Sequence, residues 1–469
     1  MTRLELHPDR LFSAEPAVRD IARRLYGEVS GLPIISPHGH TDPAWFAYDR
    51  PFSDPATLLI VPDHYVFRML YSNGVALEAI GVPRVDGGAT MTDPRSIWRL
   101  FADHYHLFRG TPSRLWLDWV FSEVFNLDVV LELKTADLYF ETIDAALKTD
   151  AFRPRALFER FGIEVLATTE SPLDPLVHHK AIRESGWGGR VITAYRPDPV
   201  VDPDTPGFAD NVRHFCESAG RPTLSWDDYL AAHRFHRARF RDAGATSTDH
   251  GHPTAATADL HPIEAAALFA HVLEMREPEA SELFRAQMLT EMARMSIEDG
   301  MVMQLHPAVY RSHNADVLSK FGRDKGADIP LPGEFVRALK PLLERFGNDS
   351  RLTLILFTLD EDSYSRELAP LAGHWPALRL GPPWWFHDSP EGMRRFRQRV
   401  TETAGFYNTV GFNDDTRAFL SIPARHDVAR RMDCDFLARM VVEHRLREDE
   451  AHELAHLLTY GLAKEAYKL

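Results

Sequence analysis

The chain has 469 residues, of which 44% are hydrophobic and 26% are charged, the balance of an ordinary globular protein. Its 68 acidic residues outnumber its 53 basic ones, and the net charge of −15 excludes general affinity for nucleic acid or an anionic membrane surface. The two cysteines, Cys216 and Cys434, are too few for a disulfide framework. So few cysteines fit a reducing cytoplasm best, and we expect a soluble protein because no apolar run approaches the roughly 20 residues that a membrane-spanning helix needs.

Short apolar runs bounded by turn residues recur along the chain, and longer stretches with helical periodicity lie between them. The predicted strands are 32–35, 163–168, 190–194, 245–248, 301–305, 352–357, 377–380 and 408–412. Predicted helices include 174–186, 228–244, 332–347, 389–405 and a long C-terminal pair from Pro423. Strands that alternate with helices in this way indicate an α/β protein with a (β/α)8 TIM-like barrel.

Two connections in this pattern are too long for ordinary loops. The segment 46–159 is helical and aromatic, and we expect its aromatic side chains to pack in a core of their own. A second helical insertion, 262–300, precedes the fifth strand. The predicted division is therefore 1–45 for an N-terminal helix and the first strand, 46–159 for the helical insertion, and 160–469 for the rest of the barrel.

Each predicted strand runs into polar or aromatic residues: "SPHGH", "TTESP", "YRPDP", "TDHGH", "HPAVYR", "TLDED", "GPPWWFHD" and "NDDTR". The carboxyl ends of the strands of a parallel barrel lie on one face, where active sites are built. The polarity of loops in general explains part of this pattern. His, Arg, Asp and Trp are nevertheless more frequent here than turns require, so we expect a functional site on this face.

The first of these segments contains His38 and His40 around a single glycine. If the strand continues through them, both side chains lie on one face of it, where they can bind one metal ion. An isolated H-x-H is more often a pair of surface histidines. Closure of the barrel, however, brings the acidic pair after the eighth strand, Asp414 and Asp415, beside them. Two imidazoles and Asp415 suit one divalent ion, with Zn²⁺ the expected metal.

A larger set of motifs resembles one family over almost the whole chain. The matching segments are "DHYVFRML" with "SNGV", "TTESPLDPLVHHKAI", "YRPD", "TDHG", "MQLH" with "YRSHN", "WWFHD", and "DTRAFLS" with "RHDVARR". Their order and content resemble the uronate (glucuronate) isomerases of the amidohydrolase superfamily. The sequence departs from the family in having "HGH" where H-C-H is common, "WWFHD" for "WWFND" and "NDDTR" for "LTDSR".

The resemblance implies an aldose–ketose isomerase that interconverts D-glucuronate with D-fructuronate and D-galacturonate with D-tagaturonate. It implies metal ligands at His38, His40 and Asp415. The substrate-site residues that it implies are His64, Tyr65, Arg196, Asp249, His306, Arg417 and the tryptophans of "WWF", Trp384 and Trp385. His306 ends the fifth strand, and its role as ligand, supporting partner or proton carrier stays open.

The chemistry of the residues agrees with a small sugar-acid substrate. Arg196, Arg311 and Arg417 stand at predicted strand ends, where guanidinium groups can bind a carboxylate despite the negative net charge. Isomerisation through an enediol needs a base and a group that stabilises the developing oxyanion. The base can be His64, Tyr65 or a metal-bound hydroxide near Asp415.

Two other functions compete with this interpretation. A metal-dependent hydrolase such as a deaminase of the same superfamily carries a glutamate three residues after the fifth-strand histidine, and here that position is Val309. A noncatalytic sugar-acid binding protein has little need for a base beside an open metal site. We also expect a homo-oligomer, since barrels with helical insertions often assemble.

Overall fold

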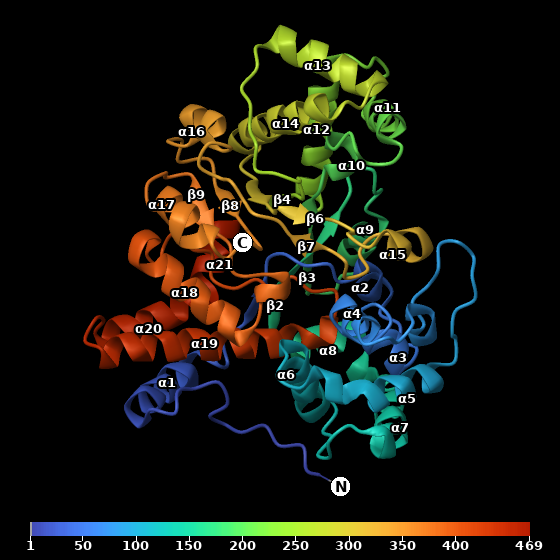
Figure 1. The fold of residues 1–469 in the computed structure, drawn as a ribbon, viewed down its shortest axis with the longest axis vertical. Helices are drawn as coiled ribbons and strands as arrows, with labels where there is room; N and C mark the ends of the chain where they lie inside the picture. Colours follow the sequence, from blue (N-terminus) through green and yellow to red (C-terminus); the bar gives the residue numbers. More distant parts are fainter. Residues whose placement is uncertain (1) are drawn as a thin grey trace.

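A computed structural model of the protein describes residues 2–469 and has a curled parallel sheet surrounded by helices (Figure 1). The sheet has seven strands in the order β1-β2-β3-β4-β5-β8-β9, and each pairs in parallel with its neighbours. They are β1 (Ile34–Ser36), β2 (Ile163–Glu170), β3 (Arg190–Tyr195), β4 (Ser247–His250), β5 (Val302–Leu305), β8 (Leu354–Leu356) and β9 (Leu378–Leu380). A small antiparallel pair, β6 (Val309–Tyr310) and β7 (Ile329–Pro330), lies outside this sheet.

The predicted TIM-like α/β fold is confirmed, with one difference at the eighth strand. The segment 408–412 forms a single parallel bridge, Leu380 to Thr409, instead of a regular strand. Gly411 has a φ of 73°, which extended strand geometry does not accommodate. The chain beyond it still reaches the first strand's loop, because the His40 N–H donates to the Thr416 carbonyl at 3.0 Å. The loops that follow the first and last parallel segments therefore meet.

The connection between β1 and β2 is helical, as predicted. Its helices are α2 (Pro43–Tyr48), α3 (Pro55–Leu59), α4 (His64–Ser72), α5 (Pro94–His104), α6 (Pro112–Trp119), α7 (Ala136–Leu147) and α8 (Pro154–Arg160). Trp98, Phe101, Tyr105 and Phe108 recur at helical spacing, and all four are buried in one hydrophobic cluster. The aromatic side chains of this insertion thus serve mainly as a core, which holds α4 over the carboxyl ends of the strands.

Further helices lie between and after the remaining strands. They are α9 (Val177–Glu184), α10 (Asp198–Val201), α11 (Phe208–Ser218), α12 (Trp226–Asp242), α13 (Pro262–Glu274), α14 (Pro278–Asp299), α15 (Ala315–Phe321), α16 (Lys340–Phe346), α17 (Ala369–Ala372) and α18 (Pro390–Ala404). The insertion of α13 and α14 before β5 agrees with the sequence. The predicted helix 332–347 is wrong in length, because α16 starts only at Lys340, with Pro341 in its first turn, where proline is tolerated.

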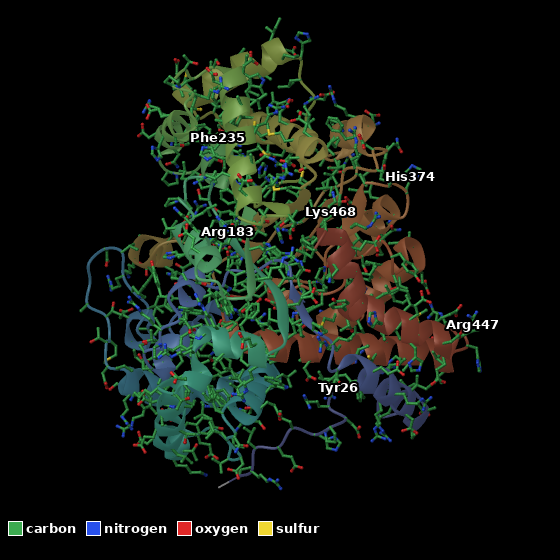
Figure 2. The ribbon with its side chains drawn as sticks, turned by 180° about the vertical axis from the view of Figure 1, so that it is seen from behind. Tyr26, Arg183, Phe235, His374, Arg447 and Lys468 are labelled. Atoms are coloured by element: carbon green, nitrogen blue, oxygen red, sulfur yellow. The ribbon has the colours of Figure 1, made fainter. Side chains whose placement is uncertain are left out.

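The final helix closes the amino-terminal end of the sheet. α19 (Ile422–Val442) and α20 (Glu448–His456) pack against α1 (Pro16–Val29), and α21 (Leu462–Tyr467) turns back to pack on apolar side chains of the strands. Tyr467 donates to Gln304 Oε1 at 2.8 Å and accepts from Asn413 Nδ2 at 2.6 Å. The reverse view shows Lys468 near the middle of the molecule, where its Nζ donates to the Gly300 carbonyl at 2.8 Å (Figure 2). The opposite, carboxyl end is left for the site.

Among residues 2–469, no helix is both long enough and apolar enough to cross a membrane.

Candidate active site

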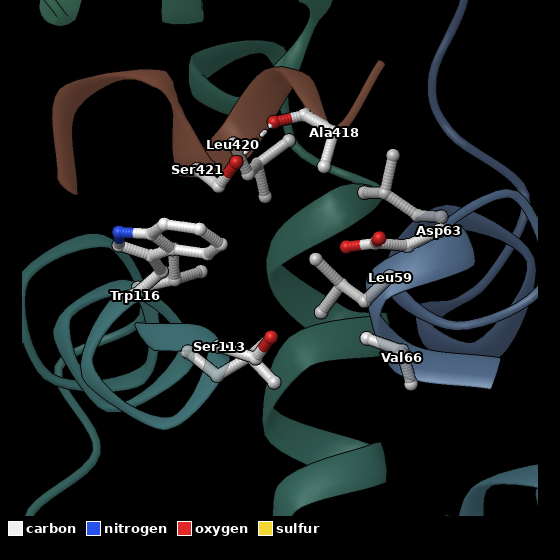
Figure 3. Close-up of a pocket in the computed structure, with 11 residues that line it drawn as sticks. Leu59, Asp63, Val66, Ser113, Trp116, Ala418, Leu420 and Ser421 are labelled. Atoms are coloured by element: carbon white, nitrogen blue, oxygen red, sulfur yellow. Dashed lines mark hydrogen bonds between the residues drawn. The ribbon is translucent and has the colours of Figure 1, made fainter. Parts of the chain in front are cut away.

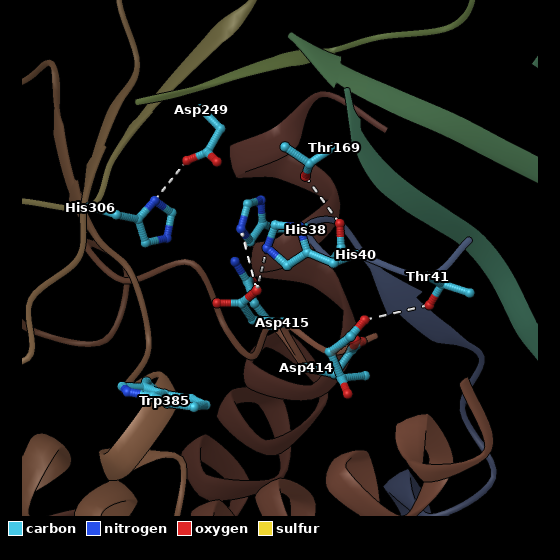
Figure 4. Close-up of polar contacts among 12 residues, drawn as sticks. His38, His40, Thr41, Thr169, Asp249, His306, Trp385, Asp414 and Asp415 are labelled. Carbon is cyan, nitrogen blue, oxygen red and sulfur yellow. Dashed lines mark hydrogen bonds and ion pairs between the residues drawn. The ribbon is translucent and has the colours of Figure 1, made fainter. Parts of the chain in front are cut away.

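His38, His40 and Asp415 meet at the carboxyl end of the sheet (Figure 4). Both imidazole Nε2 atoms approach Asp415 Oδ1, at 3.5 Å from His38 and 3.2 Å from His40. Their rings lie edge to face with centroids 5.3 Å apart. Because β1 ends at Ser36, both histidines belong to the following loop and not to one strand face, which corrects our expectation of how they converge.

The backbone around this cluster is closely packed. A β-carbon at Gly39 would lie 3.4 Å from the carbonyl oxygens of both Ala167 and Thr416, tighter than most such contacts, so a glycine lets these segments approach. Asp415 has a φ of 39°, which is uncommon for a residue with a side chain. Such backbone conformations are concentrated at functional sites, where surrounding contacts maintain them.

Of the acidic pair after the eighth segment, only Asp415 joins the cluster. Asp414 is buried on the other side of the chain, where its Oδ2 lies 3.1 Å from His426 Nε2. Burial alone would raise the pKa of Asp415, but His38 and His40 outweigh it and hold this pKa below its usual value. Asp415 is therefore ionised at neutral pH.

This donor set fits a divalent cation. A metal needs neutral imidazoles and an ionised carboxylate. Burial lowers the pKa of His40, so its ring is neutral near pH 7. Two imidazole nitrogens and one carboxylate leave further coordination positions open to a substrate, the arrangement found in catalytic metal sites.

His306 and Asp249 lie beside this cluster, and a ligand atom from each lies within 4.8 Å of the other and of one from His38. The His306 ring stacks on His38 at 5.0 Å between centroids, and its Nδ1 lies 2.7 Å from Asp249 Oδ1. Arg196 Nη1 lies 3.1 Å from Asp249 Oδ2. Burial opposes ionisation of Asp249, but Arg196 and His306 hold its pKa well below the ordinary value. His306 Nε2 is buried and has no hydrogen-bond partner within residues 2–469.

Tyr65 and His64, in the first turn of α4, form an aromatic group with Trp385. The side chain of Asp63 caps this helix by accepting from the Tyr65 N–H at 2.9 Å. The His64 ring lies edge to face with Trp385 at 4.3 Å and stacks on Tyr65 at 5.1 Å. Burial, and then Arg417 and His40, lower the pKa of His64 well below its usual value, so His64 is neutral.

The Tyr65 hydroxyl donates to Asp388 Oδ2 at 2.8 Å. Arg425 Nη1 donates to the same oxygen at 2.8 Å, and its guanidinium lies over the rings of Tyr65 and Trp116. Burial, followed by Asp388, raises the pKa of Tyr65 well above its usual value. Burial also raises the pKa of Asp388 to about 6, against the opposing effect of Arg425.

The remaining predicted residues surround these groups in different ways. Arg311 pairs with Asp328 at 2.9 Å, and Arg417 has a buried Nε without a partner within residues 2–469. Trp384 lies edge to face with His306 at 5.0 Å. Trp385 is bound by its indole N–H to the Asp328 carbonyl at 3.1 Å and packs in the aromatic group, so it supports His64 and Tyr65.

Two residues of this network, Asp388 and Arg425, were not assigned roles from the sequence. Both lie within matching motifs, Asp388 in "WWFHD" and Arg425 in "RHDVARR". An ion pair across 37 positions has no local signal, so only the motifs themselves could have indicated these residues.

A cavity behind α4 is separate from this chemistry (Figure 3). Leu59, Val66, Trp116 and Leu420 line it together with the Asp63 side chain. The space open to a water-sized sphere is about 20 Å³, which is room for a single water molecule. It is too small for a sugar and belongs to the support of α4.

Fold and site together define a class: a metal-dependent enzyme with a TIM-like barrel, whose cation ligands come from the two ends of the chain and stand at the carboxyl ends of the strands. The profile of the family described as glucuronate isomerase matches residues 14–467. A curated uronate isomerase of Rhizorhabdus wittichii is 68% identical over 99% of both chains.

Solved structures agree with this relationship. The crystal structure of glucuronate isomerase from Caulobacter crescentus has a TM-score of 0.98 and 64% identity, over 99% of this chain and 97% of that one. Uronate isomerase from Thermotoga maritima has a TM-score of 0.91 and 26% identity over 99% of both chains. The chain belongs to the glucuronate isomerase family and is an aldose–ketose isomerase.

Proposed function

We propose that this site interconverts D-glucuronate with D-fructuronate, and D-galacturonate with D-tagaturonate, with one Zn²⁺ held by His38, His40 and Asp415. The observation that carries the proposal is the meeting of these three ligands beside the His306–Asp249 pair. When bound, the divalent cation would stabilise negative charge on the sugar oxygens at C1 and C2. Side chains of the protein would bind the substrate carboxylate and transfer the protons.

The arginines would bind the carboxylate that distinguishes a uronate from a neutral sugar. Arg196 is held by two carboxylates, with its Nε 2.9 Å from Asp198 Oδ2 and its Nη1 3.1 Å from Asp249 Oδ2. Arg311 is likewise paired. Arg417 keeps a buried Nε unpaired within residues 2–469, so Arg417 is the arginine with most free capacity for the substrate.

Isomerisation breaks the C2–H bond and forms a C1–H bond, while a second proton moves from the C2 hydroxyl to the C1 carbonyl oxygen. Two proton carriers are therefore needed. We assign to His306 the transfer of the proton that leaves C2 and returns at C1. Burial lowers its pKa, which leaves Nε2 free to accept a proton at pH 7, and the Asp249 carboxylate 2.7 Å from Nδ1 stabilises the imidazolium that forms.

Tyr65 is suited to transfer the second proton, which moves from the C2 hydroxyl to the C1 carbonyl oxygen. Its raised pKa keeps the phenol protonated, and its hydrogen bond to Asp388 at 2.8 Å provides a partner that can share the proton. His64, neutral and packed on Tyr65, would bind a substrate hydroxyl beside it.

The test is turnover by purified protein of known metal content, with ketose formation followed through reduction by a coupled dehydrogenase. We expect ketose from D-glucuronate and D-galacturonate and none from D-glucose, the matched sugar that lacks a carboxylate. If the proton carrier exchanges its proton with solvent during turnover, the ketose formed in D₂O should carry deuterium at C1. Binding of D-glucuronate without ketose at any metal loading would identify a binding protein instead. The homo-oligomer and the cytoplasmic location stay predictions.

A further inference from the structure

The segment His38-Gly39-His40 has a counterpart at the end of β4, where His250-Gly251-His252 repeats the same tripeptide. The His250 and His252 rings lie 5.8 Å apart at 80°, close to the 5.3 Å and 81° of His38 and His40. Sequence and ring geometry thus occur twice on the same face of the barrel, at strands β1 and β4.

A carboxylate completes the second group as well. Asp198, at the start of α10 after the neighbouring strand β3, offers an oxygen within 4.8 Å of nitrogens from both His250 and His252. Asp198 also accepts the Gly251 N–H, with its two oxygens at 3.1 and 3.2 Å. A β-carbon at Gly251 would lie 2.8 Å from Asp198 Oδ2, so a glycine is needed for this approach.

Three of the four imidazole nitrogens in this group lack partners within residues 2–469. His250 and His252 are 0% and 3% exposed, yet His250 Nδ1 and both ring nitrogens of His252 form no hydrogen bond within residues 2–469. Buried polar atoms normally have a partner, and leaving one without costs about 1–3 kcal/mol. His250 Nε2 lies 3.1 Å from Thr248 Oγ1, a contact that holds the ring in place and leaves Nδ1 as its free nitrogen. Burial lowers the pKa values of both histidines, to about 3 for His250, so both rings are neutral donors.

We propose that His250, His252 and Asp198 form a second divalent-cation site, which ties the end of β3 to the end of β4. This site is distinct from the first cluster. Arg196 bridges Asp198 and Asp249, so a guanidinium stands beside it. Because that positive charge shares the Asp198 carboxylate, the second site binds its ion more weakly than the first. Two imidazoles and one carboxylate favour a first-row transition metal or Zn²⁺ over Mg²⁺ or Ca²⁺.

The test is a count of Co²⁺ bound to the full-length protein after removal of metal, by equilibrium dialysis with elemental analysis and by visible absorption. We expect two ions per chain, the second bound at least tenfold more weakly. His252→Ala should abolish the weaker step and keep the tighter one, and His40→Ala should do the reverse. His313→Ala, at an exposed histidine, should leave both Co²⁺-binding steps unchanged.

A second variant and a second measurement distinguish loss of the site from misfolding of the alanine variant. His252→Gln keeps a side chain of similar size, and its circular dichroism should match that of the parent. The second equivalent of Co²⁺ should raise the melting temperature of the parent and not that of His252→Gln. A parent that binds one ion, or a count of two that His252→Ala and His252→Gln leave unchanged, would overturn the proposal. Neither result would bear on turnover at His38, His40 and Asp415.

Discussion

The two ends of the barrel are built differently. At the amino-terminal end, the final helix packs apolar side chains against the strands, with Ala463 in one cluster with Val165 and Ile192. At the carboxyl end, His306 Nε2 is buried without a partner within residues 2–469, and Asp415 has a φ of 39°. Apolar packing closes one end, and the other end keeps a buried imidazole nitrogen without a partner within residues 2–469.

This difference shows where the molecule is organised for stability and where for chemistry. Unpaired buried groups and uncommon backbone conformations reduce stability, so their presence at and beside the proposed metal ligands indicates a function that requires them. Substitutions at the carboxyl end should therefore change turnover much more than folding, and those at the amino-terminal end the reverse.

The largest effect is expected at the metal ligands. His40→Ala should lower kcat/KM by at least about a thousandfold, because it removes a ligand of the cation that stabilises the oxyanion. Metal content at the tighter site should fall in parallel. His313→Ala, at an exposed histidine, should keep both turnover and metal. Full activity of His40→Ala would remove this cluster from the reaction.

The second largest loss of turnover is expected when a proton carrier is removed. Tyr65→Phe removes the hydroxyl that bonds Asp388, and kcat should fall about a hundredfold or more, the usual range for a general acid or base. Tyr71→Phe, on the same helix but exposed, is the matched control. Unchanged kcat in Tyr65→Phe would exclude Tyr65 as a carrier.

Asp388 should make stability depend on pH. Its pKa rises from 3.8 to about 6 on folding, so its contribution to stability is fully present below pH 4 and is lost as the pH rises through 6. Relative to Asp388→Asn, the parent should lose on the order of 3 kcal/mol between pH 4 and pH 7. Chemical unfolding of both proteins across this range measures the difference.

The exposed Asp362→Asn serves as the control and should show no such trend. If the parent instead gains stability over Asp388→Asn as the pH rises, the ion pair with Arg425 dominates over burial, and the folded pKa lies below 3.8.

The smallest effect is expected at Tyr467, on the helix that closes the amino-terminal end, whose hydroxyl reaches Gln304 and Asn413 inside the barrel. Tyr467→Phe leaves Gln304 and Asn413 without their shared partner and should cost about 2 kcal/mol of unfolding free energy, with kcat unchanged. Tyr407→Phe, at an exposed tyrosine, should change neither. A large loss of kcat in Tyr467→Phe with little change in stability would break the distinction between the two ends.

Most of the strands could be predicted because apolar runs bounded by turn residues report local burial. The eighth could not be predicted as a single bridge, since the conformation of Gly411 depends on its contacts in the fold. The approach of His38 and His40 to Asp415 followed from barrel topology, although both histidines lie in a loop. The division of the chain at 45 and 159 stays a prediction.

The contacts that fix the site's electrostatics were beyond the sequence. Asp414 contacts His426, whereas Asp415 faces His38 and His40. The backbone angles decide which of the two adjacent carboxylates points to which side, and the sequence does not record these angles. The pairing of Arg425 with Asp388 and Tyr65 joins three distant segments. Such buried networks are set by packing in three dimensions, which no local pattern records.

The most direct test of metal binding by His38, His40 and Asp415 is an anomalous-diffraction map of Zn²⁺-loaded crystals, recorded at the zinc absorption edge. We expect a strong peak about 2.0–2.2 Å from the ring nitrogens of His38 and His40 and from a carboxylate oxygen of Asp415. No peak among these three side chains in protein that is active and retains its metal would contradict it.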